Sequence, residues 1–251
     1  MNLVELLAFL ALLASSFAIS GWLHRLTGLT VWIFVPPIFV VGFYALNRLL
    51  TRIWIGGSTA RRHERLASSR FARKDYAGAA EEYTLALGAA HELPARIQVS
   101  RGLAYEQMED YDRALGDYGQ ALSADPCDAF ARVRRASIYR RRGAHVQAIA
   151  DTTEAIACRP EYAEAYVGRA LAYEALQQYS LALADLARAV SLPGCPVEGH
   201  YRKAALHEQA GDSEKALAAY RQFLKAAPMR HPNRREAKER VSQLGGKRKI
   251  L

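Results

Sequence analysis

A stretch of about 34 residues recurs five times along the chain, and this repetition restricts the possible folds more than any other feature. The segment RGLAYEQMEDYDRALGDYGQALSADP, residues 101–126, returns at the same offsets as RASIYRRRGAHVQAIADTTEAIACRP, RALAYEALQQYSLALADLARAVSLPG and KAALHEQAGDSEKALAAYRQFLKAAP. An earlier copy fits when Pro94 is counted as one extra residue at the joint. Repeats 1 to 5 are 60–93, 95–128, 129–162, 163–196 and 197–230. Units this short bury apolar surface against their neighbours, so the pattern predicts a stacked array.

Each repeat predicts two short amphipathic helices joined by a turn. Small residues stand at the eighth, twentieth and twenty-seventh places of the repeats, with Phe223 as an exception in repeat 5. Tyrosines at the eleventh and twenty-fourth places, such as Tyr105 and Tyr118, supply the large partners between the paired helices. Prolines such as Pro126 end the second helices, because proline cannot continue the backbone ladder.

These residues at these places resemble the tetratricopeptide repeat family. The resemblance implies an all-α, right-handed α-solenoid of five helix pairs across residues 60–230. Residues 231–251 follow as an expected capping helix and basic tail, because Ala237, Val241 and Leu244 recur at helical spacing.

The first fifty residues have a different character. Two apolar stretches, about 3–23 and 29–50, match the thickness of a bilayer, and tryptophans lie near their ends. We predict an N-terminal transmembrane helical hairpin over residues 1–50, followed by a linker at 51–59. Two alternatives stay open: residues 1–23 as a cleaved signal peptide, and a re-entrant segment instead of a kinked span at residues 36–37.

Arginines follow the second apolar stretch closely, whereas the connector between the stretches holds only Arg25. The positive-inside rule therefore places the repeats on the cytoplasmic side. Frequent arginine and alanine favour a bacterial source, so we expect the bacterial inner (cytoplasmic) membrane. The arginines are Arg48, Arg52, Arg61, Arg62 and Arg65.

Charged residues recur at two further places. The seventh place is basic in four repeats, and the twenty-third place is acidic in four. Pairing each base with the acid of the preceding repeat leaves no mismatch, so we predict ion pairs between adjacent repeats. The alternative is that the two charges are independent features of the repeat. The predicted pairs are Arg101 with Glu82, Arg135 with Asp117, Arg169 with Asp151, and Lys203 with Asp185.

The resemblance also implies a binding groove, because first helices of this family line a concave side. The groove residues carried over to this chain are Arg96, Val99, Leu103, Val133, Arg134, Arg140, Val167, Leu171, Tyr201 and Arg202. An apolar strip flanked by arginines suits an amphipathic or extended peptide carrying some acid. The alternative is that the apolar residues only pack between neighbouring helices. The family's carboxylate clamp for chaperone tails is not expected, since one of its five positions matches, at Arg134.

The net charge and the cysteines further limit the classes of function that we expect. The net charge of +9 is concentrated in residues 229–251, which carry +6, so the repeats are nearly neutral and nucleic-acid binding is not expected. The basic tail suggests contact with anionic lipid, although a merely solvated tail is an equal alternative. Cys127, Cys158 and Cys195 lack metal-binding spacing, and we expect three reduced thiols with no disulfide, no metal and no cofactor.

No catalytic motif occurs, so an enzyme is not expected. The predicted function is a membrane-anchored adaptor or scaffold that binds protein partners through its groove, with assembly of a membrane complex as one setting. The alternatives are a stoichiometric structural subunit of a larger membrane complex, an enzyme-associated regulatory subunit and, less favoured, an RNA-binding protein.

Overall fold

The computed structural model describes residues 59–90 and 95–247. The predicted transmembrane hairpin, residues 1–50, lies outside this part. No helix within the described part combines the length and the apolar character needed to cross a bilayer. The chain divides into two compact units, and the second, His63–Leu87 with Leu93–Leu251, contains almost all of the described structure.

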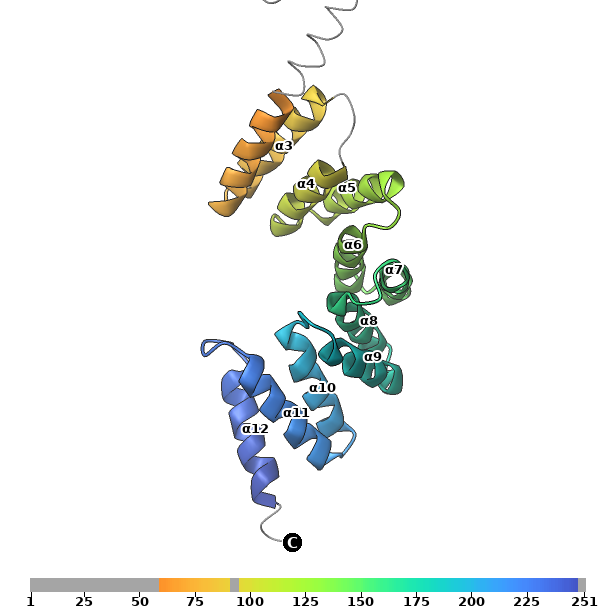
Figure 1. The fold of residues 1–251 in the computed structure, drawn as a ribbon, viewed down its shortest axis with the longest axis vertical. Coiled ribbons are helices and arrows are strands. Elements are labelled where there is room, and N and C mark those ends of the chain that lie inside the picture. The colour runs from red at the N-terminus through yellow and green to blue at the C-terminus, as the bar shows by residue number, and fades with distance from the viewer. Residues whose placement is uncertain (1–58, 91–94, 248–251) are drawn as a thin grey trace, which may run out of the picture. The chain divides into compact units, whose positions relative to one another are not determined.

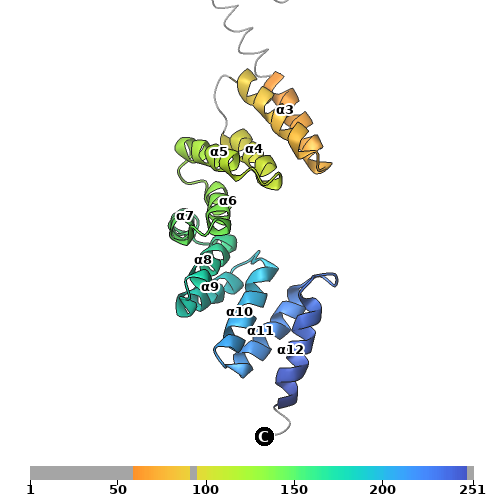
Figure 2. The same cartoon turned by 180° about the vertical axis from the view of Figure 1, so that it is seen from behind.

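The described residues are helical, and each repeat holds two helices (Figures 1 and 2). Repeat 1 contains a helix over residues 59–72 and α3 (Tyr76–Ala89). Repeat 2 contains α4 (Ala95–Gln107) and α5 (Tyr111–Ala124), and repeat 3 contains α6 (Ala129–Arg141) and α7 (His145–Cys158). Repeat 4 contains α8 (Ala163–Ala175) and α9 (Tyr179–Ser191), and repeat 5 contains α10 (Val197–Gln209) and α11 (Ser213–Ala226). The last helix is α12 (Arg234–Lys247).

Local chemistry fixes where these helices begin and end. The Asp110 carboxylate accepts a hydrogen bond from the backbone N–H of Arg113, and Asp128 does the same for Ala131, so both aspartates cap helix N-termini. Pro126 follows the last residue of α5 by two positions, as Pro160 and Pro228 follow α7 and α11. Their fixed φ and missing N–H stop the helices there.

The core lies between the paired helices, where alanine meets tyrosine. Tyr118 and Tyr220 are among the largest fully buried side chains. Gly102 lets α4 approach α5, because a Cβ built on Gly102 would lie 2.9 Å from Cε1 of Tyr118. Phe223, which replaces the usual small residue, is fully buried and contacts the rings of Tyr201 and His231 at centroid distances of 5.3 and 5.2 Å.

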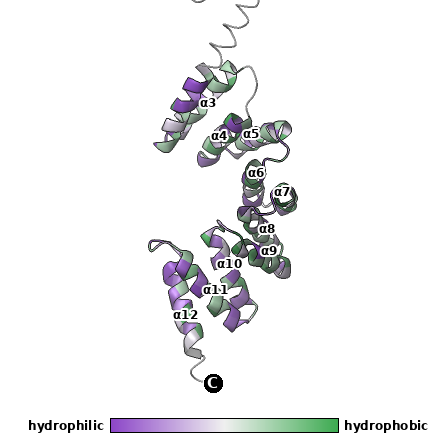
Figure 3. Ribbon diagram, viewed as in Figure 1, coloured by the Kyte–Doolittle hydropathy of each residue, from purple (hydrophilic) through white to green (hydrophobic). Residues whose placement is uncertain are grey.

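Helix α12 packs against the last repeat. Ala237 and Leu244 are buried in one cluster with Leu217, Tyr220 and Phe223 of α11. Much of the rest of α12 is hydrophilic, as its colouring in Figure 3 shows. The helix therefore covers the apolar surface of α11 and presents a polar surface of its own.

In repeats 2, 3 and 4, the charged residues at the seventh and twenty-third places pair inside the repeat, not between repeats. The predicted pairs Arg101–Glu82, Arg135–Asp117, Arg169–Asp151 and Lys203–Asp185 are therefore wrong. Each arginine donates two hydrogen bonds to an aspartate of its own helix pair, at 2.6–2.9 Å. The observed pairs are Arg101–Asp117, Arg135–Asp151 and Arg169–Asp185.

The geometry of a helix hairpin explains the observed pairing. Antiparallel helices rise equally from their turn, so residues equally distant from the turn lie level with each other. Glu109, whose positive φ of 60° marks the turn, is the midpoint between Arg101 and Asp117. In the outer repeats, by contrast, Leu66 is level with Glu82, and Lys203 is level with Ala219. Repeats 1 and 5 each lack one of the two charges, and for this reason the sequence pattern favoured pairing between neighbouring repeats.

Two of the three arginines also donate a hydrogen bond to the preceding repeat. Arg101 Nη1 donates to Thr84 Oγ1 at 3.1 Å, and Arg169 Nη1 donates to Thr153 Oγ1 at the same distance. Glu82, which was assigned to Arg101, instead contacts His63 at 2.7 Å and Arg70 at 3.3 Å. At the seventh place, the contact between repeats is thus made to a neutral hydroxyl, while the charge of the arginine is satisfied by the aspartate of its own hairpin.

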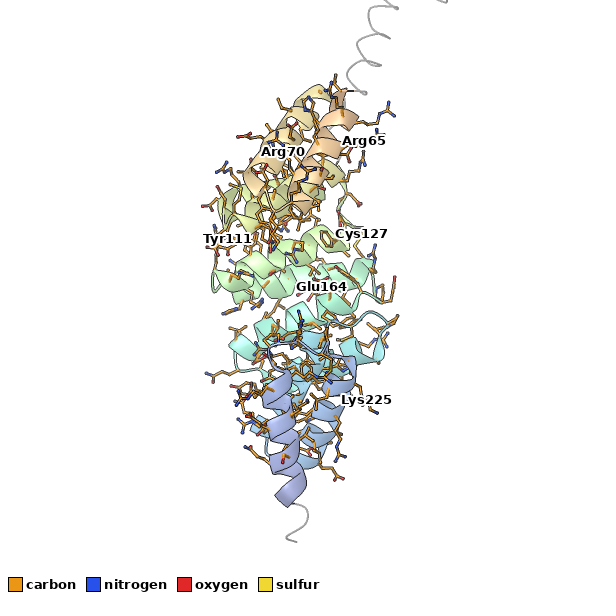
Figure 4. All side chains as sticks on the ribbon, turned by 90° about the vertical axis from the view of Figure 1, so that its left-hand side faces the viewer. Arg65, Arg70, Tyr111, Cys127, Glu164 and Lys225 are labelled. Atoms are coloured by element: carbon orange, nitrogen blue, oxygen red, sulfur yellow. A yellow bond between two sulfur atoms is a disulfide. The ribbon has the colours of Figure 1, made fainter. Side chains whose placement is uncertain are left out.

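The expectation of three reduced thiols without a disulfide is also wrong, because Cys127 and Cys158 are joined. Cys127 lies in the loop after α5, where Figure 4 labels it, and Cys158 is the last residue of α7. Their Cα atoms are 5.4 Å apart, within the range that a disulfide requires. The bond ties the ends of two successive second helices together, and Cys195 stays free.

Candidate functional site

A hollow of about 140 Å³ lies between the first helices of repeats 3 and 4, α6 and α8. Five of the predicted groove residues line it: Val133, Arg134, Arg140, Val167 and Leu171. Parallel packing of α6 and α8 brings these side chains to one side, because they recur every three or four residues along each helix. We call this hollow the α6–α8 groove.

The apolar residues of the groove also belong to the core. Val133 and Val167 are each only 5% exposed, so much of their surface packs against neighbouring helices. Leu171 is half-buried and offers more apolar surface to a ligand. The two valines therefore mainly pack between neighbouring helices, as the alternative interpretation of the sequence stated. The residues around them form most of the surface that a ligand can reach.

The other predicted groove residues do not line this hollow. Val99 is buried and Leu103 packs against the core of repeats 1 to 3. Arg96 forms an ion pair with Glu64 at 2.8 Å. Tyr201 donates to Glu236 of α12 at 2.7 Å, and Arg202 is bound to two glutamates. These side chains are engaged in contacts within the chain.

Between repeats 2 and 3, an arginine and a glutamate are joined across the junction. Arg134 donates to Glu106 at 2.6 and 3.1 Å, and the buried Glu106 also accepts from the Tyr118 hydroxyl at 3.0 Å. Burial and the neighbouring charge of Glu106 raise the pKa of Tyr118. Burial alone would lower the pKa of Arg134, but Glu106 outweighs it and the pKa is raised. Arg134 is therefore firmly held at the groove wall.

The junction between repeats 4 and 5 uses the same two places. Glu174 Oε1 accepts from Arg202 at 3.3 Å, and Arg202 also donates to Glu198 at 2.7 Å. Glu174 lacks a tyrosine partner because Leu186 stands where repeat 2 has Tyr118. Its second oxygen, Oε2, is buried without a hydrogen-bond partner among the described residues.

The junction between repeats 3 and 4 breaks this pattern. Arg140 stands where Glu106 and Glu174 stand, and Gly168 stands where Arg134 and Arg202 stand. Within the described residues, the Arg140 guanidinium forms no hydrogen bond or ion pair, although it is half-buried. Burial lowers the pKa of Arg140, and the charges of Arg141 and Arg202 act in the same direction. This junction therefore places in the groove a cation that has no partner among the described residues.

Sequence reasoning missed five residues of the groove: Ala136, Ser137, Glu164, Gly168 and Pro196. Figure 4 labels Glu164 on α8. Three of them, Ser137, Glu164 and Gly168, occupy repeat positions that the family resemblance assigns to the groove. The sequence prediction took mainly the apolar and basic residues at these positions. Including the small and polar residues at the same positions would have identified Ser137, Glu164 and Gly168. Ala136 and Pro196 lie at other positions, Ala136 in α6 and Pro196 directly before α10.

The groove offers shape, apolar surface and one positive charge. In the part of the chain that the structure describes, no group of three His, Cys, Asp or Glu side chains is arranged to hold a metal ion. What the arrangement can do is bind a segment of complementary shape and charge.

Comparison with known proteins agrees with the observed fold. A family model described as tetratricopeptide repeat matches residues 99–163, and a second model of the same description matches residues 163–193 and 197–228. Together these matches span half of the chain. No curated protein matches the chain in sequence.

Solved structures share the arrangement of helices at low sequence identity. PilW, a widely conserved type IV pilus biogenesis factor, aligns with a TM-score of 0.64 and 18% identity over 74% of this chain and 86% of PilW. A tetratricopeptide repeat protein from Parabacteroides merdae aligns at 0.61 and 21% identity, over 75% of this chain and 73% of that one. MamA from Desulfovibrio magneticus aligns at 0.59 and 18% identity, over 67% and 95%. At these identities the likeness extends to the fold, and with the family models it shows that this chain belongs to the tetratricopeptide repeat family.

Proposed function

We propose that this chain is a non-enzymatic adaptor, anchored in a membrane by residues 1–50, that binds a protein partner in the α6–α8 groove. Tetratricopeptide repeat proteins generally act as protein-interaction scaffolds. The observation that carries the proposal for this chain is the groove itself, which combines Leu171 and the edges of two valines with the unpaired Arg140. A peptide segment with apolar and acidic side chains complements that surface.

The anchor rests on the sequence, namely the two apolar stretches with tryptophans near their ends. Anchoring raises the effective concentration of the groove near membrane-bound partners without any new contact. The arginines after the second stretch favour the cytoplasmic side of a bacterial inner membrane. The Cys127–Cys158 disulfide argues against a cytoplasmic location of the repeats, because disulfides persist in oxidising compartments.

Site-specific photo-crosslinking in cells tests the adaptor function. A photoreactive residue at Ser137 or Leu171 lies in the groove, whereas one at Val146 or Leu181 lies on an exposed position of α7 or α9. We expect a crosslinked partner protein from the two groove positions and none from the two control positions. Equal crosslinking from all four positions, or none from the groove, would contradict the proposal.

Copurification of groove variants separates an adaptor from a permanent subunit. A structural subunit of a membrane complex would copurify with its partners in fixed stoichiometry in mild detergent, whatever the state of the groove. An adaptor would lose its partner when Leu171→Asp places a charge in the groove. The variant Leu181→Asp, on exposed α9 surface, is the matched control and should retain the partner.

A further inference from the structure

The α6–α8 groove contains an arginine, Arg140, that has no ion-pair partner among the described residues because the usual pair of places has changed. At two other junctions, the sixth and twelfth places of successive repeats hold an arginine and a glutamate that bind each other, Arg134–Glu106 and Arg202–Glu174. At the junction between repeats 3 and 4, both members have changed, to Gly168 and Arg140. Gly168 supplies no side chain, and a Cβ built on it would lie 3.3 Å from Cγ2 of Thr152. Arg140 reverses the charge of the glutamate that it replaces.

Neighbouring groups do not satisfy Arg140. The cations near it, Arg141 and Arg202, oppose its charge, while Glu174 and Glu198 favour it. Both of these glutamates accept hydrogen bonds from Arg202, and neither is within ion-pair distance of Arg140. A half-buried guanidinium has lost part of its hydration, and a carboxylate that reaches it regains that free energy as charge-assisted hydrogen bonds.

The other charged groups of the groove are paired. Arg140 and Leu171 lie near the C-terminal ends of α6 and α8, whereas Glu164 lies seven residues before Leu171, about two helical turns away. Glu164 has Arg134 at 4.0 Å and accepts a hydrogen bond from the Tyr162 hydroxyl at 2.7 Å. Arg134 is also bound to Glu106. Among the described residues, Arg140 is therefore the charged group of the groove that a ligand can neutralise.

We propose that Arg140 binds the carboxylate of an aspartate or glutamate side chain in an extended partner segment, with apolar partner residues seated beside Leu171. The proposal rests on the proposed function and specifies the chemistry of its partner. We expect the carboxylate that binds Arg140 to belong to a side chain of the partner and not to its C-terminus. Among the described residues, Arg140 is the one unpaired guanidinium that lines the groove, so it offers a site for one carboxylate. Repeats continue on both sides of the groove, so a partner segment can extend beyond that carboxylate in both directions.

A peptide library identifies the probe and tests the charge. The full chain in mild detergent is used to select twelve-residue peptides from a phage-displayed library, and the selected peptides are synthesised with amidated C-termini. We expect an acidic residue adjacent to apolar residues in the selected sequences. Replacing that residue by its amide should weaken binding by about tenfold or more, as expected for a lost charge-assisted bond.

A double-mutant cycle assigns the effect to Arg140. The variant Arg140→Gln should lose the same factor and should bind the acidic and amide peptides equally. The variant Arg141→Gln removes the same charge from the next residue, which is exposed, and should keep the preference for the acidic peptide. Arg140→Glu should prefer a peptide with lysine at that position. Circular dichroism of each variant verifies that the helices are intact.

Each outcome decides between the two proposals. If no peptide is selected, both the adaptor function and the role of Arg140 are overturned. If peptides bind the groove but lack the acidic residue, or if Arg140→Gln retains the preference for it, the adaptor function stands and the role of Arg140 is overturned. If an unblocked C-terminal carboxylate can replace the internal acid with equal affinity, the side-chain assignment is wrong.

Discussion

Three aspartates, Asp117, Asp151 and Asp185, are buried at equivalent places, and each is held by the arginine at the same level of its hairpin. Two parallel hydrogen bonds satisfy both carboxylate oxygens, a geometry that lysine cannot reproduce. A buried ion pair of this kind contributes little to stability in comparison with apolar residues. Losing only one member is costly, because the remaining charge stays buried without a partner.

Replacing Arg169 tests this asymmetry. Asp185 has no cation other than Arg169 within 4.0 Å among the described residues, whereas Asp151 keeps Arg132 at 3.9 Å when Arg135 is removed. We expect Arg169→Met to lower the free energy of unfolding by about 3 kcal/mol, and Arg135→Met to lower it by less. Urea unfolding followed by circular dichroism measures both. The control Arg188→Met, at an exposed position of α9, should change stability little. Equal losses for Arg169→Met and Arg188→Met would contradict the expectation.

The charged places were visible in the sequence, but their partners were not. Comparing repeats shows which positions carry charge, yet it cannot show which positions are level with each other. That depends on the turn inside each repeat, where the residue with positive φ is a glycine in repeats 3 and 5 but Lys74, Glu109 and Gln177 in the other three. Arg140 presents the same difficulty. The sequence shows the charge of Arg140 but not which residue would pair with it. The Arg134–Glu106 pair identifies the two places that bind each other, and at the next junction these places hold Gly168 and Arg140.

At the scale of the helix pair, the closeness of two helices depends on a few small residues. Gly102 of α4 lies against the Tyr118 ring of α5, and that ring cannot retreat easily because Tyr118 is fully buried and its hydroxyl is bound to Glu106. Gly116 is different, since it lies on the exposed side of α5 with open space around the position of a Cβ. The same substitution at these two glycines should have opposite effects.

We expect Gly116→Ala to raise the free energy of unfolding by about 0.5–1 kcal/mol, because alanine is the better helix former and nothing obstructs its methyl group. Gly102→Ala should lower it by about 1–3 kcal/mol, because the methyl group displaces the Tyr118 ring from a close-packed core. Thermal unfolding of both variants under identical conditions gives the comparison. Stabilisation by Gly102→Ala would show that α4 and α5 are less tightly packed than described.

The disulfide acts on two consecutive helix pairs. Cys127 and Cys158 are separated by 31 positions, so their bond removes conformational freedom from the unfolded chain and stabilises the fold by about 3 kcal/mol. Adding a reductant to the purified oxidised protein should therefore lower its melting temperature. The variant Cys158→Ser should have this lower melting temperature both with and without the reductant. Cys195→Ser should respond to reductant as the original chain does, because Cys195 is outside the bond.

At the scale of the whole molecule, the order of elements could be predicted because the physics of the array is local. Each helix pair packs chiefly on its neighbours, so a period in the sequence becomes a stack in space. The alanines and tyrosines that set the period are the buried residues of the helix pairs. The disulfide could not be predicted from spacing, because Cys127 and Cys158 occupy different places in their repeats and meet only through the packing of repeat 2 on repeat 3.

The cysteines also report on which side of the membrane the repeats lie. The cytoplasm keeps thiols reduced, whereas a disulfide persists on the oxidising side. If the arginines after the second apolar stretch hold the repeats in the cytoplasm, as proposed, the Cys127–Cys158 bond of the structure would be reduced there, and each chain in living cells should carry three free thiols.

Cells quenched in acid, then denatured and labelled with a mass-adding maleimide, should therefore give a chain shifted by three labels, and Cys195→Ser should be shifted by two. On the oxidising side the original chain would be shifted once and Cys195→Ser not at all, since Cys127 and Cys158 would be joined before labelling. That result would reverse the proposed orientation and leave the groove intact, because the α6–α8 groove contains neither cysteine of the bond. The partner with the acidic segment would then have to be sought on the opposite side of the membrane.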